Sequence, residues 1–200
     1  MDNGIQPGSR HYVVISHTVP ADGDFSLNDL PGSGGRIDVI ARCISSALLI
    51  SNGIRRDASI TICLSSGDRP VSVSVFGSSV RYLNPDERST AALIRNALVK
   101  ASRLEEGISS PGVYFSHQSL EEVMHHISGG CNTYYLSELG EPVVTFKAPS
   151  FMVLGDQKGV TAEEDALLAR SQALKVSLSR LSLQSDQCIT ISNWIMDRVV

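Results

Sequence analysis

The sequence predicts an α/β fold, with a mainly parallel sheet covered by helices on both faces. Short runs rich in β-branched residues alternate with segments whose apolar residues recur at helical spacing. Several helix-start signals separate these runs. The 200 residues are 42% hydrophobic and 19% charged, which is enough apolar material for a sizeable core.

The first predicted elements are a strand, a long loop and a helix. Residues 11–17 (HYVVISH) are rich in β-branched residues, as strands are. Residues 18–35 are rich in Gly, Pro, Ser and Asp, so we expect an irregular loop there. Apolar residues then repeat at helical spacing from Ile37 to Leu48, and Gly53 is expected to close this helix as its C′ glycine.

Three extended segments follow, at residues 59–64, 71–75 and 77–83. A helix-start signal comes next. Asn84 is the expected cap, Pro85 stands in the first helical position, and Glu87 follows three residues after the cap. We expect this second helix to end near Gly107.

The C-terminal half continues the alternation, with strands expected at residues 113–115, 133–136, 151–154 and 175–178. Ser119 with Glu122, and Thr161 with Glu164, have the spacing of capping boxes and predict two further helices. A terminal helix is expected from about Ser185.

Composition and charge restrict the class of protein. No apolar run is long enough to span a membrane and no secretory signal opens the chain, so we expect a cytoplasmic protein with a disordered N-terminus (residues 1–10) and a single domain over residues 11–200. We expect no metal, because the only histidine cluster, His125–His126, places its side chains on different faces of a helix. The net charge of −4 argues against indiscriminate nucleic-acid binding.

Two features near the first helix suit an anion. Gly32–Gly35 precede the helix start, where free backbone N–H groups favour phosphate, although no Walker lysine follows. A cluster of arginines comes next, and the planar guanidinium suits bidentate phosphate contacts; its members are Arg36, Arg42, Arg55 and Arg56. A solvated helix face explains the same arginines equally well.

The stretch from residue 151 to residue 194 has the features of a ligand pocket. Its apolar strand stops at Gly155-Asp156, and a second loop, rich in Ser and Leu, ends at Leu183. Cys188 then lies just inside a last apolar segment. Two loops and a helix start can converge there, although an ordinary α/β tail would show the same pattern.

Four sequence blocks, in this order, resemble the tRNA pseudouridine N1-methyltransferases of the SPOUT superfamily. They are DLPGSGGRIDVIARC (29–43), NGIRRD (52–57), LNPDERSTAALIRNAL (83–98) and QCITISNW (187–194). The resemblance covers nearly the whole chain from His11 onward. The family is known chiefly from archaea, and we leave open a bacterial member. Where family members often carry a histidine before the ITI segment, this chain has Gln187-Cys188.

The resemblance implies a SPOUT methyltransferase fold with a C-terminal trefoil knot, in which S-adenosylmethionine binds. It also implies a homodimer with the active site at the subunit interface. By matching position, the cofactor-binding residues would be Leu136, Gly155, Leu178, Leu183 and Cys188.

The resemblance further implies methyl transfer to N1 of a pseudouridine in tRNA or another structured RNA. Asp38 and Arg36 are the catalytic candidates, Asp38 as base or uracil-orienting group and Arg36 as a phosphate or carbonyl contact. Arg36, Arg55 and Arg56 are the expected RNA contacts. Two alternatives stay open: a non-catalytic RNA-binding dimer with the same fold, and a phosphate-binding enzyme built on Gly32–Gly35.

Overall fold

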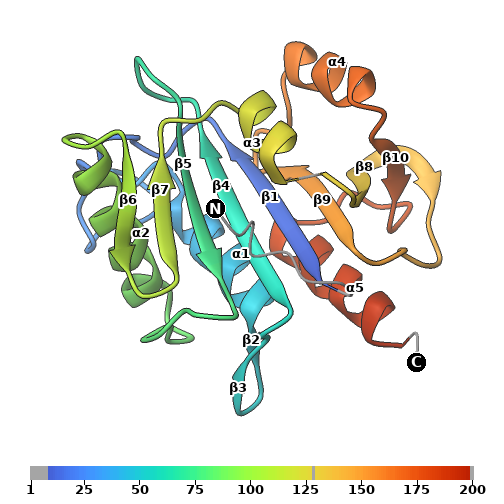
Figure 1. Ribbon diagram of the computed structural model, residues 1–200, viewed down its shortest axis with the longest axis horizontal. Coiled ribbons are helices and arrows are strands. Elements are labelled where there is room, and N and C mark those ends of the chain that lie inside the picture. The colour runs from blue at the N-terminus through green and yellow to red at the C-terminus, as the bar shows by residue number, and fades with distance from the viewer. Residues whose placement is uncertain (1–8, 128, 199–200) are drawn as a thin grey trace.

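The computed structural model describes residues 9–127 and 129–198 and consists of one large sheet with helices packed against it (Figure 1). The first strand, β1 (Arg10–Ser16), begins at Arg10, so the end of the segment expected to be disordered is part of the sheet. Residues 1–8 of that segment lie outside the described residues, whereas Ser9 is described and buried.

Five helices occur in the described chain: α1 (Ile37–Leu48), α2 (Glu87–Ala101), α3 (Leu120–Ile127), α4 (Ala162–Arg170) and α5 (Ser185–Asp197). The strands after β1 are β2 (Leu49–Ile50), β3 (Gly53–Ile54), β4 (Ala58–Leu64), β5 (Val71–Phe76), β6 (Glu106–Ser110), β7 (Val113–Ser116), β8 (Asn132–Pro142), β9 (Ser150–Gly155) and β10 (Leu174–Ser177). Strands β2 and β3 form a separate hairpin, which projects at the bottom of Figure 1.

The main sheet has the strand order β10-β8-β9-β1-β4-β5-β7-β6. The pairings from β10 through β4 are parallel, which confirms the predicted mainly parallel sheet. The pairings from β4 to β6 are antiparallel. Strands β4 and β5, like β6 and β7, are joined by connections too short for the crossover that a parallel pair needs.

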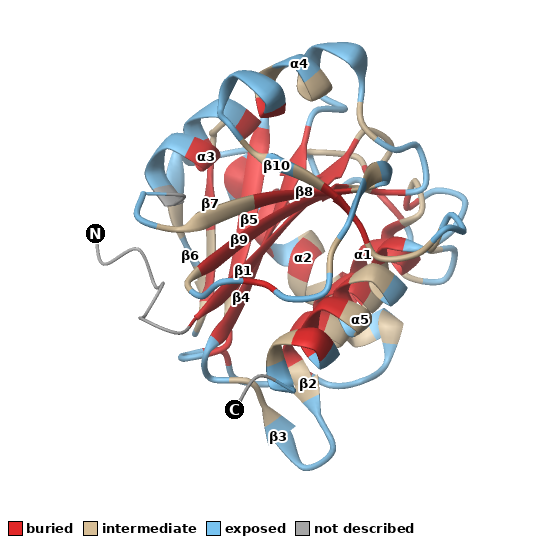
Figure 2. Cartoon of the chain, turned by 90° about the vertical axis from the view of Figure 1, so that its right-hand side faces the viewer, coloured by how far each residue is buried: buried red, intermediate tan, exposed pale blue. Residues whose placement is uncertain are grey.

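Helices cover both faces of the sheet, as predicted. Helices α1, α2 and α5 pack on one face, and α3 and α4 lie on the other (Figure 2). Each face of the sheet has its own hydrophobic core, and alternate residues of β1 point into the two cores. Tyr12 and Val14 belong to the core beneath α1, α2 and α5, and Val13 and Ile15 to the core beneath α3 and α4. Every residue of β1 is therefore buried. Within the described residues no helix is long and apolar enough to cross a membrane.

Two helix boundaries differ from the sequence prediction. Helix α1 ends at Leu48 because the next residues turn into the β2–β3 hairpin, so Gly53 lies in a strand and is not a C′ glycine. The cap of α2 is Asp86 rather than Asn84: its carboxylate accepts a hydrogen bond from the Ser89 N–H at 2.8 Å. By contrast, the predicted capping box of α4 is present, with both reciprocal bonds between Thr161 and Glu164.

Two segments beside these helices also differ from the prediction. Helix α2 ends at Ala101, short of the expected Gly107, because residues 106–110 pair with β7 as strand β6. Residues 77–83, expected to be extended, form turns and bends instead.

The last residues of β8 and the first residue after it lie against the end of β10. A Cβ added to Gly140 would come within 2.5 Å of the Val176 backbone, so this crossing requires glycine. The Val143 N–H also donates to the Ser177 carbonyl at 3.0 Å. The chain then crosses from the face that carries α4 to the face that carries α5, and α5 packs beside α1. Loops after three strands thus meet the start of α5.

Candidate functional site

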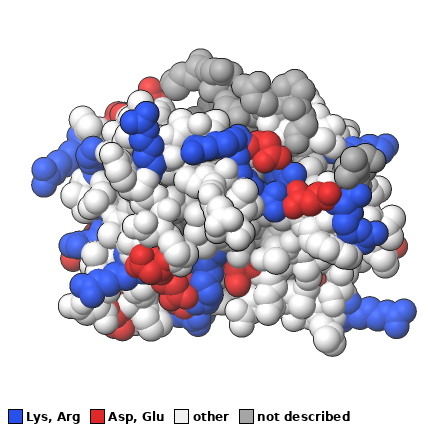
Figure 3. All heavy atoms as spheres, turned by 90° about the horizontal axis from the view of Figure 1, so that it is seen from below, with Lys and Arg blue, Asp and Glu red and all other residues white. Residues whose placement is uncertain are grey.

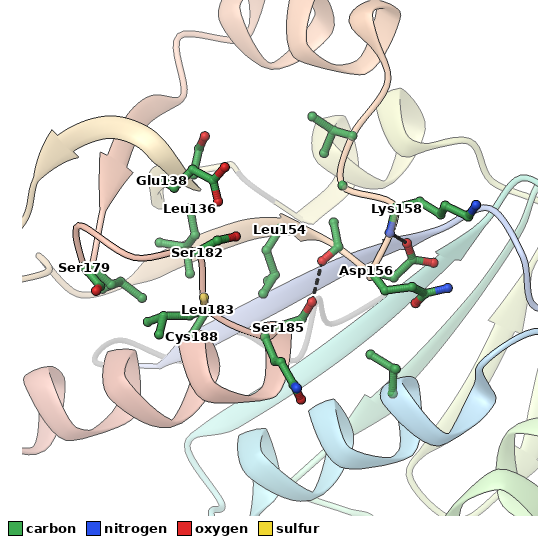
Figure 4. Close-up of a pocket in the computed structure, with 18 of the residues that line it drawn as sticks. Leu136, Glu138, Leu154, Asp156, Lys158, Ser179, Ser182, Leu183, Ser185 and Cys188 are labelled. Carbon is green, nitrogen blue, oxygen red and sulfur yellow. Dashed lines mark hydrogen bonds between the residues drawn. The ribbon is translucent and has the colours of Figure 1, made fainter. Parts of the chain in front are cut away.

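A pocket of about 580 Å³ opens where these loops meet the start of α5 (Figure 4). It lies beyond the carboxyl ends of β9 and β10, the edge at which open α/β sheets commonly bind ligands. All five residues predicted to bind a cofactor line this pocket, together with Arg36. Segments far apart in the sequence therefore converge on one pocket.

The floor of the pocket is the turn after β9. A Cβ on Gly155 would collide with the backbone of Gly159, so the turn closes only around glycine. The Asp156 carboxylate accepts hydrogen bonds from the N–H groups of Lys158 at 2.8 Å and His17 at 3.3 Å. The Ser185 hydroxyl donates to the Gly155 carbonyl at 2.7 Å and fixes the start of α5 to this turn.

The walls of the pocket combine apolar and polar side chains. Six leucines line it, from β8, from β9 and from the loop between β10 and α5: Leu136, Leu139, Leu154, Leu178, Leu181 and Leu183. Cys188 is half-buried beside Leu183, and burial, with a smaller contribution from the negative charge of Asp186, raises the pKa of its thiol to about 11. At neutral pH Cys188 is therefore an uncharged wall residue and not a thiolate nucleophile.

An arginine–aspartate group lies on the α1 side of the pocket. Arg36 caps α1 in the left-handed conformation (φ 70°), and its Nε and Nη2 donate to the two carboxylate oxygens of Asp38 at 3.0 and 3.1 Å. The guanidinium of Arg42 donates to Asp38 at 3.1 Å and to Glu87 at 3.0 Å. Arg36 and Arg42 line the pocket, while Asp38 is buried behind them.

The two arginines keep Asp38 ionised. Burial alone would raise the pKa of Asp38, but the hydrogen bonds and positive charges of Arg36 and Arg42 outweigh it and hold the pKa below its ordinary value. A carboxylate with a lowered pKa is a weak base. Asp38 is therefore better suited to orienting Arg36 than to accepting a proton.

The Asp38 pair predicts a dependence of stability on pH. The pKa of Asp38 is lower in the folded than in the unfolded state, so the ionised carboxylate contributes to the free energy of unfolding. This contribution is present above about pH 4, the ordinary aspartate pKa, and is lost as the pH falls through the pKa of the folded state. We expect Asp38→Asn to lose less unfolding free energy than the wild type between pH 7 and pH 3, measured by urea denaturation. Equal losses in both proteins would contradict this.

Arg55 and Arg56, also predicted to contact RNA, lie away from the pocket. Helix α1 separates them from Arg36 by 12 residues, roughly 18 Å. Arg55 donates to Asp197 at 3.0 and 2.6 Å, and Arg56 to the Gly77 carbonyl at 2.8 Å. Seen from below, the molecule carries both basic and acidic side chains (Figure 3). The arginines of the sequence cluster therefore do not form one patch.

The glycine-rich loop before α1 is not a phosphate site. Its N–H groups are already occupied: Gly32 donates to the Asp29 carboxylate at 3.2 Å, and Ser33 does so at 2.8 Å. Gly34 donates to the Asp29 carbonyl at 3.2 Å. The Asp29 carboxylate therefore occupies the N–H groups that a bound phosphate would need. The phosphate-loop hypothesis is therefore wrong, and the aspartate three residues before the loop was the signal against it.

Several pocket residues were not singled out from the sequence. They are Glu138, Asp156, Lys158, Ser179, Ser182 and Ser185. Asp156 had a sequence signal, as the residue beside Gly155 where the strand stops, and Ser185 had one as the expected start of the terminal helix. The others occupy loops whose path depends on packing far along the chain.

Known proteins match nearly the whole of this chain. Residues 9–199 match a family model described as "Putative SAM-dependent RNA methyltransferase". The tRNA (pseudouridine(54)-N(1))-methyltransferase of Methanocella arvoryzae is 42% identical over 193 residues, covering 94% of this chain and 99% of that protein. The protein of the same name from Methanococcoides burtonii is 40% identical over 194 residues, covering 94% and 96%. Both organisms are archaea, so a bacterial member is not supported.

A solved structure shares the fold at low sequence identity. It is Nep1 from Archaeoglobus fulgidus bound to S-adenosylhomocysteine, with a TM-score of 0.61 over 96% of this chain and 98% of that one, at 14% identity. At this identity the match concerns the fold alone.

Proposed function

Because this chain belongs to the family of S-adenosylmethionine-dependent RNA methyltransferases, we propose that it methylates N1 of a pseudouridine in tRNA. The observation that carries the proposal is the convergence of Leu136, Gly155, Leu178, Leu183 and Cys188 with Arg36 in one pocket. The full-length matches to tRNA (pseudouridine(54)-N(1))-methyltransferases support tRNA as the substrate.

The pocket suits the cofactor. Its volume, about 580 Å³, lies within the usual range for small-molecule sites. Leu136, Leu178 and Leu183 offer apolar walls for an adenine ring, and the Glu138 carboxylate offers a counter-charge for a cation. S-adenosylmethionine, when bound, supplies an electrophilic methyl group on a positively charged sulfur.

The arginine–aspartate group suits the uracil ring. When N1 of pseudouridine loses its proton, negative charge develops on the ring carbonyls, and a fixed donor beside them stabilises it. Arg36 lines the pocket and has its guanidinium fixed by two hydrogen bonds to Asp38. We infer that Arg36 contacts the ring or its phosphate, that Asp38 orients Arg36, and that the N1 proton leaves to solvent.

The finer features of the family belong to the same proposal: one domain over residues 11–200, a SPOUT trefoil knot and a homodimer. The hydrogen bond from Val143, just after β8, to Ser177 at the end of β10, and the passage of the chain from the α4 face to the α5 face, support a path in which the β8–β9 connection encloses the chain leading to α5. The homodimer rests on the membership of the family.

Paired transcripts test the function. We expect labelled S-adenosylmethionine to transfer its methyl group to a tRNA transcript that carries pseudouridine at position 54, and nucleoside mass spectrometry to identify N1-methylpseudouridine. The matched transcript with uridine at that position should stay unlabelled, because its N1 is bonded to the sugar. RNA binding without transfer to either transcript would favour the non-catalytic RNA-binding dimer instead.

A further inference from the structure

The loop between β5 and α2 (residues 77–86, the β5–α2 loop) contains an unusual residue. Tyr82 has a φ of 62°, in the left-handed region, although it is bulky and is neither Gly, Asn nor Asp. Its side chain is 81% exposed. Neither backbone preference nor burial explains a tyrosine at this position.

The surrounding structure holds Tyr82 in place. Val80 and Leu83, on either side, are buried in the main core. The Val80 N–H donates to the Phe76 carbonyl at 2.8 Å, and the Arg81 N–H donates to the Pro111 carbonyl at 3.3 Å. Such over-determined strain is characteristic of functional positions. The backbone of the loop is therefore held in place while the Tyr82 ring is exposed to solvent.

Two arginines accompany the ring. The exposed Arg56 donates to the carbonyls of Gly77 at 2.8 Å and Val80 at 3.5 Å, so its guanidinium lies against this loop. Arg81, the neighbour of Tyr82, is also exposed.

The acids nearby have other partners. Asp86 caps α2 through Ser89, and Glu87 accepts from Arg42. The ion pair with Arg42 neutralises Glu87, whereas Asp86 keeps its negative charge because Ser89 is uncharged, so Arg56 and Arg81 stand beside one acid.

The loop is connected to the candidate active site. Helix α2 begins at Glu87, whose carboxylate accepts from the Arg42 guanidinium at 3.0 Å. Arg42 in turn lines the pocket. The loop begins at Gly77, beside the start of β4 and so at the opposite edge of the sheet from Gly155, and an RNA must span about 20 Å to occupy both.

We propose that Tyr82 stacks on an unpaired base of the RNA substrate outside the pocket, while Arg56 and Arg81 contact the adjacent phosphates. Exposed aromatic rings flanked by arginines are the general means of holding unstacked RNA bases. The inference rests on the proposed function, since it requires an RNA substrate. In this proposal Arg56 contacts the RNA beside the β5–α2 loop, whereas Arg36 contacts it at the pocket.

Substitution of Tyr82 by Asn tests the proposal, because Asn tolerates the left-handed conformation and removes only the ring. We expect the affinity for the pseudouridine-containing tRNA to fall at least about fivefold, without a lower melting temperature. The slope of log Kd against log salt concentration should stay unchanged, because the ring carries no charge.

Arg81→Gln should instead reduce the slope of log Kd against log salt concentration by about one. Tyr82→Phe should bind as the wild type does.

The control is Ile108→Asn, which removes a similarly exposed apolar side chain (71% exposed) from strand β6. We expect it to leave RNA affinity unchanged. If the wild-type protein transfers methyl groups but Tyr82→Asn binds the tRNA with wild-type affinity, the proposal is overturned. A change in the oligomeric state of Tyr82→Asn on sedimentation would also overturn it. Absence of transfer by the wild type would overturn the proposed function instead, so the two failures are distinguishable.

Discussion

Replacement of Arg36 by Ala is expected to lower kcat/KM for tRNA methylation about 100- to 1000-fold, the cost of removing one preorganised donor from a site of developing negative charge. Arg36 is a pocket-lining arginine with both Nε and Nη2 bonded to Asp38. Arg36→Lys should recover little, since an ammonium cannot reproduce the bidentate pair. Affinity for S-adenosylhomocysteine, measured by calorimetry, should stay within about twofold if Arg36 acts on the RNA.

Arg69 provides the matched control for Arg36. It also forms a bidentate pair, with Glu105 at 3.1 and 2.7 Å, and it does not line the pocket. We expect Arg69→Ala to retain wild-type kcat/KM. If Arg36→Ala also retained wild-type turnover, the catalytic role inferred for the arginine–aspartate group would be wrong.

Replacement of Gly155 by Ala is expected to destabilise the protein and to weaken cofactor binding. The added Cβ meets the backbone of Gly159, which no side-chain rotation can move aside. Overpacking of this kind costs about 1–3 kcal/mol, which corresponds to a melting temperature lower by roughly 3–10 °C in a domain of this size. The turn after β9 must shift, so we expect at least about a tenfold loss in S-adenosylhomocysteine affinity by calorimetry.

Gly53 provides the matched control for Gly155. It lies in β3, and a Cβ added there meets nothing within 4 Å. Gly53→Ala should leave both the melting temperature and the cofactor affinity close to wild type. Wild-type cofactor affinity in a folded Gly155→Ala protein would contradict the assignment of this turn to the cofactor site.

Local signals predicted much of the fold. The capping box at Thr161 and Glu164 fixed the start of α4, because both hydrogen bonds of that motif lie within four residues. Two equally local signals competed at α2, where Asn84 and Asp86 are both good caps. The structure uses Asp86, which bonds the Ser89 N–H, while the Asn84 carbonyl accepts from Thr90. Choosing between them requires the packing of the helix.

Long-range pairings set the limit on predicting the site. The predicted cofactor residues came from matching positions in a known family, and the fold brings them into one pocket although Leu136 and Cys188 belong to different elements. No sequence pattern showed that Arg55 would pair with Asp197, 142 residues away. For the same reason, the sequence did not show that the arginine cluster would be split. Arg36 and Arg42 line the pocket, whereas Arg55 contacts the end of α5 and Arg56 contacts the β5–α2 loop.

The central claim is that this pocket transfers a methyl group to N1 of pseudouridine in tRNA. It is tested most directly by incubating the purified protein with labelled S-adenosylmethionine and total RNA from a strain lacking the protein, followed by nucleoside mass spectrometry. We predict one labelled nucleoside, N1-methylpseudouridine, recovered from the tRNA fraction. Label in any other nucleoside, or none in RNA that still contains unmethylated pseudouridine, would contradict the account.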